Sequence, residues 1–187
     1  HRLDKCTSGL MMVARNLTAH KRLVDALQAR SVKREYLTVV NTVLTAGGTI
    51  DAPIGRHPVD RKRMAVVNSG KAAVTHYRVE ARFRAHTLVR VQLETGRTHQ
   101  IRVHMAHRQM PVVGDPVYGG RLRLPKAASS ELTECLKNFR RQALHATRLT
   151  LEHPRGGETL SWQVDVPPDM QTLIEALRQD ADEHADD

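Results

Sequence analysis

The sequence predicts an α+β fold in which a mixed, largely antiparallel sheet is flanked by helices. Several segments have the alternating or β-branched composition of strands, and short loops join most neighbours among them. Other segments, inserted at intervals, repeat apolar residues at helical spacing. Apolar residues make up 40% of the 187 residues, which is enough for one domain with a buried core.

The first part of the chain contains a strand, a helix and a second strand. The short apolar run at residues 10–14 indicates a strand, and Thr18 is placed to cap a helix that continues to about Arg30. Residues 34–41 are rich in β-branched side chains and indicate the next strand. Residues 47–48 are both glycine and mark a turn.

The middle of the chain combines two strands with one helix. Residues 72–81 and 86–94 alternate apolar and polar side chains, as strands with one buried face do. Gly96 permits a tight passage from the second strand into a helix expected over residues 98–108. Pro111 prevents this helix from continuing much further.

The last part of the chain predicts a helix, a hairpin and a final helix. Residues 129–141 are expected to be helical, and residues 146–152 and 159–166 form a hairpin around a Pro- and Gly-containing turn. The final helix begins near Pro168. Its apolar residues recur at helical spacing and are expected to pack on the core: Met170, Leu173, Ile174 and Leu177.

We expect one domain over residues 1–178 and an acidic, flexible tail over residues 179–187. The chain opens on His1 without a methionine, inside the first of the motifs described below, and is therefore expected to be an N-terminally truncated fragment.

The charge of the chain predicts a nucleic-acid partner. Lys and Arg number 29 against 20 acids, a net charge of +9, and residues 1–179 carry about +14 because five acids lie in the last eight residues. Two basic loops, at residues 55–63 and 119–127, concentrate this charge. Aromatic residues are only 3%, so contacts to phosphates and RNA shape are favoured over the stacking of many bases.

Several other classes of protein are disfavoured. No apolar run approaches the roughly 20 residues of a membrane span, and no secretory signal is visible. The two cysteines, Cys6 and Cys135, do not make a disulfide scaffold, which favours a reducing, cytoplasmic setting. Phosphate-binding loops of the GxxxxGK[ST] kind are absent.

Two further enzyme classes lack the residue patterns they need. His104 and His107 are three apart with His99 nearby, but no cysteine pair or carboxylate completes a metal site. Cys6 lies close to Asp4, but no hydrolase signature surrounds it.

The segment at residues 1–9 is the first candidate for chemistry. It places the single carboxylate of Asp4 between Arg2 and Lys5, and these cations favour its ionised form. An ionised aspartate suits a nucleophile or a base better than a general acid. A solvated surface turn is the plain structural alternative.

The segment at residues 93–104 is the second candidate. His99 and Arg102 are three apart and would share one face of the expected helix. An arginine held rigidly on such a face can orient a carboxylate or bind a phosphate through two hydrogen bonds. The alternative is an amphipathic helix whose Ile101, Val103 and Met105 pack in the core.

These motifs resemble those of the RluA family of pseudouridine synthases, and the matching stretches occur in the family's order. The stretch from residue 56 to residue 78 is most similar to the RluD branch, whose members act on large-subunit (23S) rRNA. The stretches that carry the resemblance are His1-Arg2-Leu3-Asp4 with Thr7-Ser8-Gly9, Lys33-Arg34-Glu35-Tyr36, Gly96 to His104, Gly114 to Gly119, and Gln142 to Ala146.

The resemblance implies the pseudouridine synthase catalytic fold, with an RNA-binding cleft, and a role for each motif residue. Asp4 would be the catalytic aspartate, and Tyr36 would pack against the target uracil. Arg102 would hold Asp4 ionised, with Arg97 as the alternative partner, and Arg2 would replace the flipped base in the RNA stack. The other implied RNA-binding residues are Arg97, His99, Arg56, Arg61, Lys62, Arg63 and Arg121.

The implied reaction converts uridine to pseudouridine and requires no metal or cofactor. The C1′–N1 bond breaks, the uracil rotates and a C1′–C5 bond forms, so the nucleotide must first be flipped out of its stack. Asp4 could attack C1′, remove H2′ to give a glycal, or attack C6 of the ring, and the sequence does not choose among these routes.

The resemblance also implies partners. The substrate would be large-subunit rRNA, the protein a monomer, and an S4-like RNA-binding domain would lie upstream in the full-length chain. The main rival is a non-enzymatic module that grips rRNA with its basic body. A fragment without the upstream domain could also be inactive.

Overall fold

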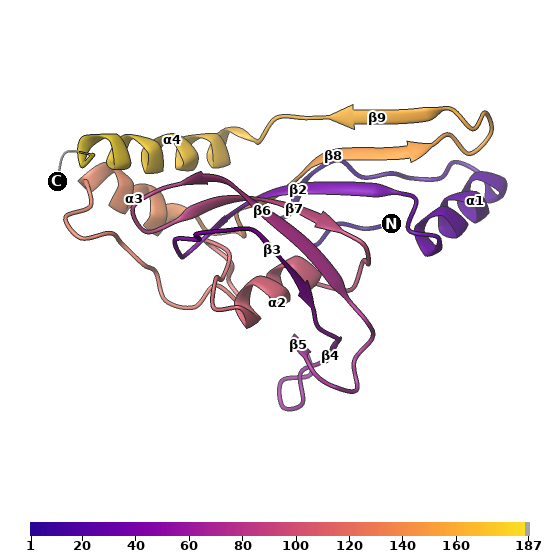
Figure 1. The fold of residues 1–187 in the computed structure, drawn as a ribbon, viewed down its shortest axis with the longest axis horizontal. Coiled ribbons are helices and arrows are strands. Elements are labelled where there is room, and N and C mark those ends of the chain that lie inside the picture. The colour runs from indigo at the N-terminus through magenta and orange to yellow at the C-terminus, as the bar shows by residue number, and fades with distance from the viewer. Residues whose placement is uncertain (186–187) are drawn as a thin grey trace.

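The computed structural model describes residues 1–185, which form nine strands and four helices (Figure 1). The strands are β1 Ser8–Gly9, β2 Lys33–Val40, β3 Gly48–Asp51, β4 Ile54–Arg56, β5 Met64–Val66, β6 Val74–Arg82, β7 Thr87–Leu93, β8 Leu144–Glu152 and β9 Thr159–Gln163. The helices are α1 Leu17–Gln28, α2 Gln100–His107, α3 Ser130–Asn138 and α4 Pro168–Glu183.

Seven strands form one sheet in the order β1-β8-β2-β7-β6-β3, with β9 also paired to β8. Only the β1–β8 pair of this sheet is parallel among the described residues, so the predicted mixed, largely antiparallel sheet is confirmed. One edge of β8 is shared, because its first residues pair with β1 and its later residues pair with β9. Through the β1–β8 pair, the N-terminal segment joins the sheet beside the beginning of β8.

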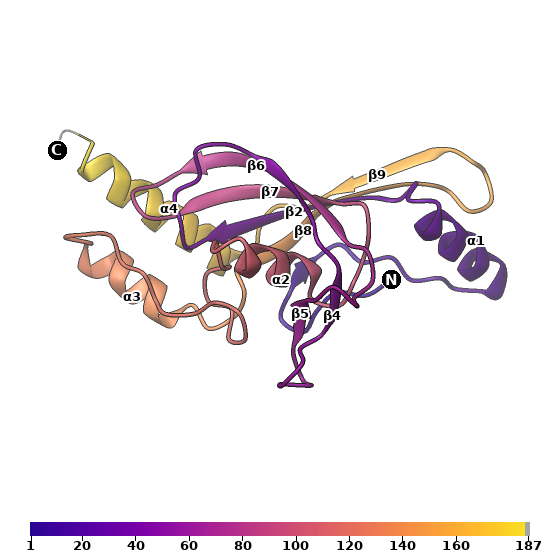
Figure 2. The same cartoon turned by 60° about the horizontal axis from the view of Figure 1, so that its bottom comes forward.

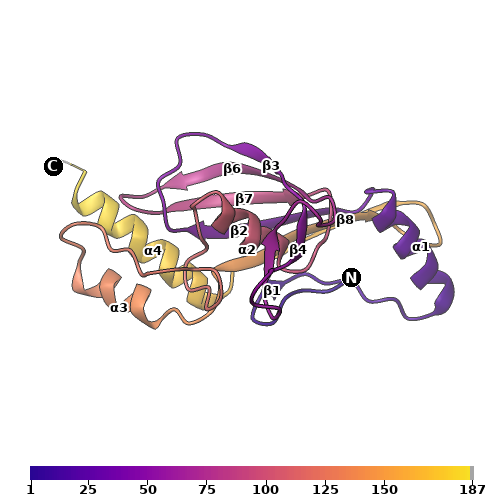
Figure 3. The same cartoon turned by 90° about the horizontal axis from the view of Figure 1, so that it is seen from below.

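The helices lie at the ends and on one face of the sheet. Helix α2 lies across the sheet, while α3 and α4 pack together at the end opposite α1 (Figures 2 and 3). The β4–β5 hairpin projects away from the body (Figure 1). The main core joins the sheet, α2, α3 and α4 through side chains that include Val39, Val89, Met105, Leu132 and Leu173.

The predicted strand at residues 10–14 is wrong. Leu10 donates one backbone hydrogen bond to Ala146, but the run makes no ladder beyond it. Leu10 and Met12 instead pack on a small satellite cluster around Val32. The strand is the preceding pair, Ser8–Gly9, because these two residues lie beside β8.

The cap of the first helix also differs from the expectation. Asn16, not Thr18, accepts a hydrogen bond from the Ala19 amide at 2.8 Å, so α1 begins at Leu17. Asn16 has the extended backbone that a capping residue adopts, with φ of −152°. The turn expected at residues 47–48 is shifted too, since Gly48 already belongs to β3.

Helix α4 continues to Glu183, so residues 179–183 of the expected flexible tail are helical. Within this last part of α4, Asp180 is 2% exposed and accepts two hydrogen bonds of 3.1 Å from Arg84. Asp186 and Asp187 lie outside the described residues.

None of the helices within residues 1–185 combines the length and the apolar composition that a membrane crossing requires.

Candidate active site

A cavity of about 320 Å³ separates the N-terminal segment from β2 and from the turn between β7 and α2. It brings together the two segments that the sequence singled out, although they are almost a hundred residues apart. The polar side chains that line it are His1, Arg2, Asp4, Thr7, Arg34, Tyr36, Arg97, Thr98, His99 and Gln100.

Asp4 begins a tight turn whose backbone is held in place by hydrogen bonds. The Thr7 amide donates to the Asp4 carbonyl at 3.0 Å, and the Gln142 side-chain amide donates to the Lys5 carbonyl at 2.7 Å and to the Thr7 hydroxyl at 3.0 Å. Gln142 is 1% exposed and therefore a fixed anchor. The Asp4 side chain is 17% exposed, so its carboxylate remains open to the cavity.

Arg102 connects Asp4 to a second, fully buried carboxylate. Its Nη1 donates to Asp4 Oδ2 at 3.3 Å, while its Nε and Nη2 donate to the two oxygens of Asp115 at 2.7 and 2.9 Å. Burial opposes the Arg102 charge, but the Asp115 and Asp4 carboxylates outweigh it and raise the pKa of the guanidinium. Of the two arginines that the sequence left open, Arg102 is the one in contact with Asp4.

Asp115 is a residue whose role the sequence reasoning missed. Burial raises its pKa, but the Arg102 hydrogen bond and the amides of Tyr118 and Val117 outweigh burial and lower it. Asp115 is therefore held in its ionised form, paired with the guanidinium of Arg102. In the sequence the Gly114-to-Gly119 stretch carries only the family resemblance, and nothing local in it indicates a partner at residue 102.

Tyr118 was also missed, and it fills the space behind Arg102. The guanidinium of Arg102 lies 5.1 Å from the centre of the Tyr118 ring, and that of Arg63 lies 5.2 Å from it. The Met64 amide donates to the Tyr118 hydroxyl at 3.0 Å, and His99 Nδ1 lies 2.9 Å from the same oxygen. Tyr118 thus joins α2 to the base of the basic hairpin.

His99 does not share a helical face with Arg102, contrary to the prediction. It is the residue before α2 and adopts a left-handed backbone with φ of 57°. The Gln100 side chain fixes this turn by accepting from the Thr95 hydroxyl and the Arg97 amide. Burial lowers the pKa of the His99 imidazole, although the Asp4 charge opposes this effect.

Tyr36 forms a buried wall of the cavity on β2 and is 6% exposed. Burial raises the pKa of its phenol, so the side chain is neutral at physiological pH. Arg34, two residues earlier on β2, lines the same cavity and is 8% exposed.

The remaining predicted RNA-binding residues fall into three places. Arg2 and Arg97 are exposed at the cavity, where Arg97 Nε donates to the Ala72 carbonyl at 2.9 Å. The β4–β5 hairpin carries four of them: Arg56, Arg61, Lys62 and Arg63. Arg121 lies apart, at a second cavity of about 520 Å³ beside α3, so the structure does not bring it to Asp4.

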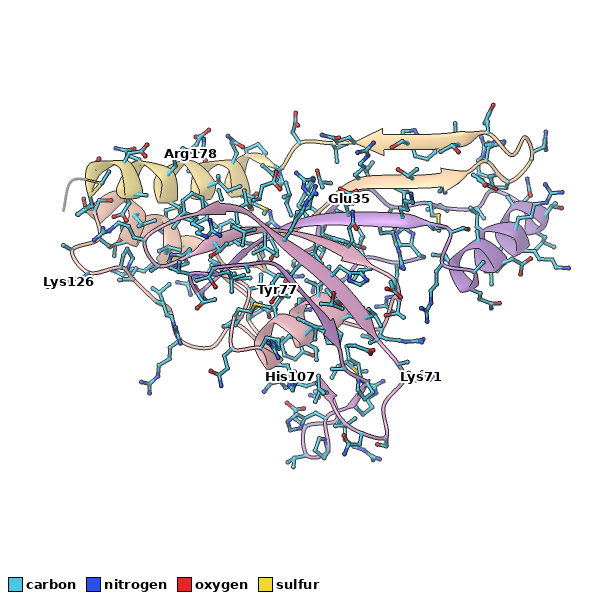
Figure 4. All side chains as sticks on the ribbon, viewed as in Figure 1. Glu35, Lys71, Tyr77, His107, Lys126 and Arg178 are labelled. Carbon is cyan, nitrogen blue, oxygen red and sulfur yellow. The ribbon has the colours of Figure 1, made fainter. Side chains whose placement is uncertain are left out.

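Basic side chains are also spread over other parts of the surface. Lys126, Lys71 and Arg178 are exposed on three different sides of the molecule (Figure 4). His104 is buried within hydrogen-bond distance of Thr75 and the Ala52 carbonyl. Across residues 1–185, no three His, Cys, Asp or Glu side chains gather as a metal site requires.

Comparison with known proteins gives a consistent set of relatives. The family model described as RNA pseudouridylate synthase matches residues 1–107. Ribosomal large subunit pseudouridine synthase D of Pseudomonas aeruginosa is 61% identical over 180 residues, which cover 96% of this chain and 56% of the relative. The protein of the same name from Escherichia coli K12 is 57% identical over 187 residues, covering 100% and 57%. The chain thus spans just over half the length of these relatives.

The fold has solved counterparts as well. The structure of human RNA pseudouridylate synthase domain containing 4 aligns with a TM-score of 0.75 and 27% identity, over 95% of this chain and 74% of that one. Human RNA pseudouridylate synthase domain containing 1 aligns with a TM-score of 0.70 and 26% identity, over 95% and 78%.

Proposed function

The chain belongs to the RNA pseudouridylate synthase family, within its RluA group and similar to the RluD branch, and we propose that it isomerises specific uridines of large-subunit (23S) rRNA to pseudouridine. The observation that carries the proposal is the Asp4 carboxylate, which faces a cavity of about 320 Å³ and forms an ion pair with the buried Arg102. The names of the relatives in Pseudomonas aeruginosa and Escherichia coli support the choice of RNA.

The cavity suits a single flipped nucleotide. Uridine buried in a stack does not expose its C1′, so the target nucleotide leaves the stack and enters between Asp4 and Tyr36. Tyr36, as a neutral phenol, packs against the uracil. Arg2, exposed at the mouth of the cavity, takes the place of the flipped base in the RNA stack.

Asp4 performs the chemistry at the sugar or the base. The C1′–N1 bond breaks, the uracil turns, the C1′–C5 bond forms, and the proton on C5 is lost while N1 gains one. Three routes satisfy this balance: attack of Asp4 on C1′, removal of H2′ to give a glycal, and attack on C6. In each route Asp4 starts as a carboxylate, which the Arg102 guanidinium favours.

The protein binds RNA mainly through contacts between basic side chains and the RNA phosphates. The β4–β5 hairpin projects from the body and bears four cations, of which Arg56, Arg61 and Lys62 are exposed. Binding is therefore expected to weaken steeply with salt, because each neutralised phosphate releases counterions. A cytoplasmic location, a monomeric state and an S4-like RNA-binding domain upstream remain predictions.

The proposal is tested on unmodified large-subunit rRNA made in vitro, without metal or cofactor. The full-length protein, the 187-residue chain, and full-length Asp4→Asn and Asp4→Ala are each incubated with it. Pseudouridine is then mapped by carbodiimide labelling and reverse-transcription stops. Asp182→Asn, an exposed aspartate on α4, is the matched control.

We expect modification by the wild type and by Asp182→Asn, and none by the Asp4 variants, which should still bind the RNA. Modification of a defined set of uridines would also identify the targets. Tight binding by every form with no pseudouridine would favour the rival function, a non-enzymatic rRNA-binding module.

A further inference from the structure

Arg34 is a buried cation in the active-site cavity without an anionic partner. The residue is 8% exposed and lines the cavity, yet its Nε is buried without a hydrogen-bond partner. None of the ion pairs formed among residues 1–185 includes it. Arg102, equally buried in the same region, is bonded to two carboxylates.

The two carboxylates of the site pair with Arg102 and not with Arg34. Asp115 is bonded to Arg102 through both oxygens, and Asp4 is paired with the same arginine. The ionisable group that acts on Arg34 is Tyr36, whose phenol burial keeps neutral. Within residues 1–185 of the free protein, Arg34 therefore has no ion-pair partner.

A buried guanidinium without an anionic partner lowers the stability of the folded protein. Folding alone therefore does not explain why Arg34 is buried here. Arginine stays protonated in proteins, so Arg34 cannot escape the cost by losing its proton. Burial lowers its pKa, which shows that the surroundings oppose the charge. A group held in this way destabilises the free protein and is stabilised when an anion arrives.

The position of Arg34 indicates which anion this is. Residues two apart on a strand face the same side, so Arg34 and Tyr36 both point into the cavity from β2. The guanidinium lies over Gly96, where an added Cβ would be 2.6 Å from its Nη1. It thus lies in the same cavity as Tyr36, the side chain proposed to contact the uracil.

We propose that Arg34 binds a phosphate of the RNA backbone at the target nucleotide. A nucleotide within RNA carries a phosphate on each side, and the planar fork of arginine matches a phosphate through two hydrogen bonds. A carbonyl oxygen of the base would leave the positive charge uncompensated. The inference rests on the proposed function for the identity of the RNA, but its test separates the two.

The test uses full-length Arg34→Met, which keeps an unbranched apolar side chain, and Arg34→Lys, which keeps the charge. Arg178→Met, an exposed arginine on α4, is the matched control (Figure 4). Thermal unfolding is measured on the free proteins. Affinity for unmodified large-subunit rRNA is measured at several salt concentrations, and pseudouridine is mapped in the same RNA.

Loss of a phosphate contact predicts opposite effects on the two properties. Arg34→Met should raise the melting temperature of the free protein while weakening RNA binding about tenfold at low salt. The slope of log affinity against log salt should become shallower by about 0.7 to 0.9, the change expected for one phosphate. Arg34→Lys should retain most of this slope, and Arg178→Met should leave the melting temperature unchanged.

A lower melting temperature for Arg34→Met, or an unchanged affinity and salt slope, would overturn the inference and give Arg34 a structural role. If the wild type forms pseudouridine but Arg34→Met keeps its slope, the inference fails and the proposed function stands. If the wild type forms no pseudouridine but the salt slope of Arg34→Met is shallower by the amount expected for one phosphate, the proposed function fails and the phosphate contact stands.

Discussion

His86 makes the stability of the fold sensitive to acid. It lies at the connection between β6 and β7, it is fully buried, and both of its ring nitrogens lack a hydrogen-bond partner among residues 1–185. Burial lowers the pKa of the imidazole from 6.5 to about 4, although the charge of Asp180 on α4 opposes this effect. The native state therefore holds His86 neutral over a range in which the unfolded chain is protonated.

The size and sign of the effect follow from these two pKa values. Between pH 6.5 and about 4 the unfolded state binds more protons at this position, so the free energy of unfolding falls as the pH falls. A pKa that drops from 6.5 to about 4 corresponds to about 3 kcal/mol, at about 1.4 kcal/mol per pH unit. The loss begins near pH 6.5 and is complete below about pH 4.

Urea unfolding of the wild type and of His86→Phe between pH 7 and pH 4 measures this difference. Burial also lowers the pKa of His104 and of His145, so both proteins lose stability in acid. The wild type should lose about 3 kcal/mol more than His86→Phe. His20→Gln, which alters an exposed histidine on α1, should follow the wild type. Parallel pH profiles for the wild type and His86→Phe would refute the reasoning.

Two further predictions concern the Asp4 segment. Asp115→Asn should lower the free energy of unfolding by about 3 kcal/mol and also lower kcat, because it breaks the buried ion pair with Arg102. Asp169→Asn, which alters a more exposed ion pair, should lower the free energy of unfolding by less than about 1 kcal/mol in the same assay. Gly9→Ala should cost more than Gly157→Ala: both residues have positive φ, but only at Gly9 would a Cβ meet backbone, 2.2 Å from a carbonyl oxygen of β8. Equal melting temperatures for the two glycine variants would contradict this.

Elements with strong local patterns could be predicted from the sequence. The strands expected at residues 72–81 and 86–94 are β6 Val74–Arg82 and β7 Thr87–Leu93. Along β6 the less and the more exposed residues largely alternate, because one face of the sheet is more buried than the other. The helix expected near Pro168 begins at that residue, where proline fits the first helical turn.

The N-terminal strand could not be predicted, because its cause lies elsewhere in the chain. Residues 10–14 have the stronger apolar pattern, yet the strand is Ser8–Gly9, which pairs with His145 and Ala146 of β8. Ser8 also bonds the His145 ring through its hydroxyl at 2.9 Å. A two-residue strand has no periodicity of its own, so only the position of β8 determines it.

The charges of the site show why its chemistry was only partly visible in the sequence. Asp4 and Asp115 pair with Arg102, whereas Arg34, in the same region, is in none of the ion pairs found among residues 1–185. The net charge of +9 counts Arg34 and the loop arginines alike, and most of the clustered basic residues lie in the loops. Burial separates them: a loop cation stays solvated and contributes one salt-sensitive contact, whereas a buried cation without a partner is costly until an anion binds. The arginine that best distinguishes RNA bound in the cavity from RNA bound on the surface is therefore Arg34, which no count of basic residues could identify.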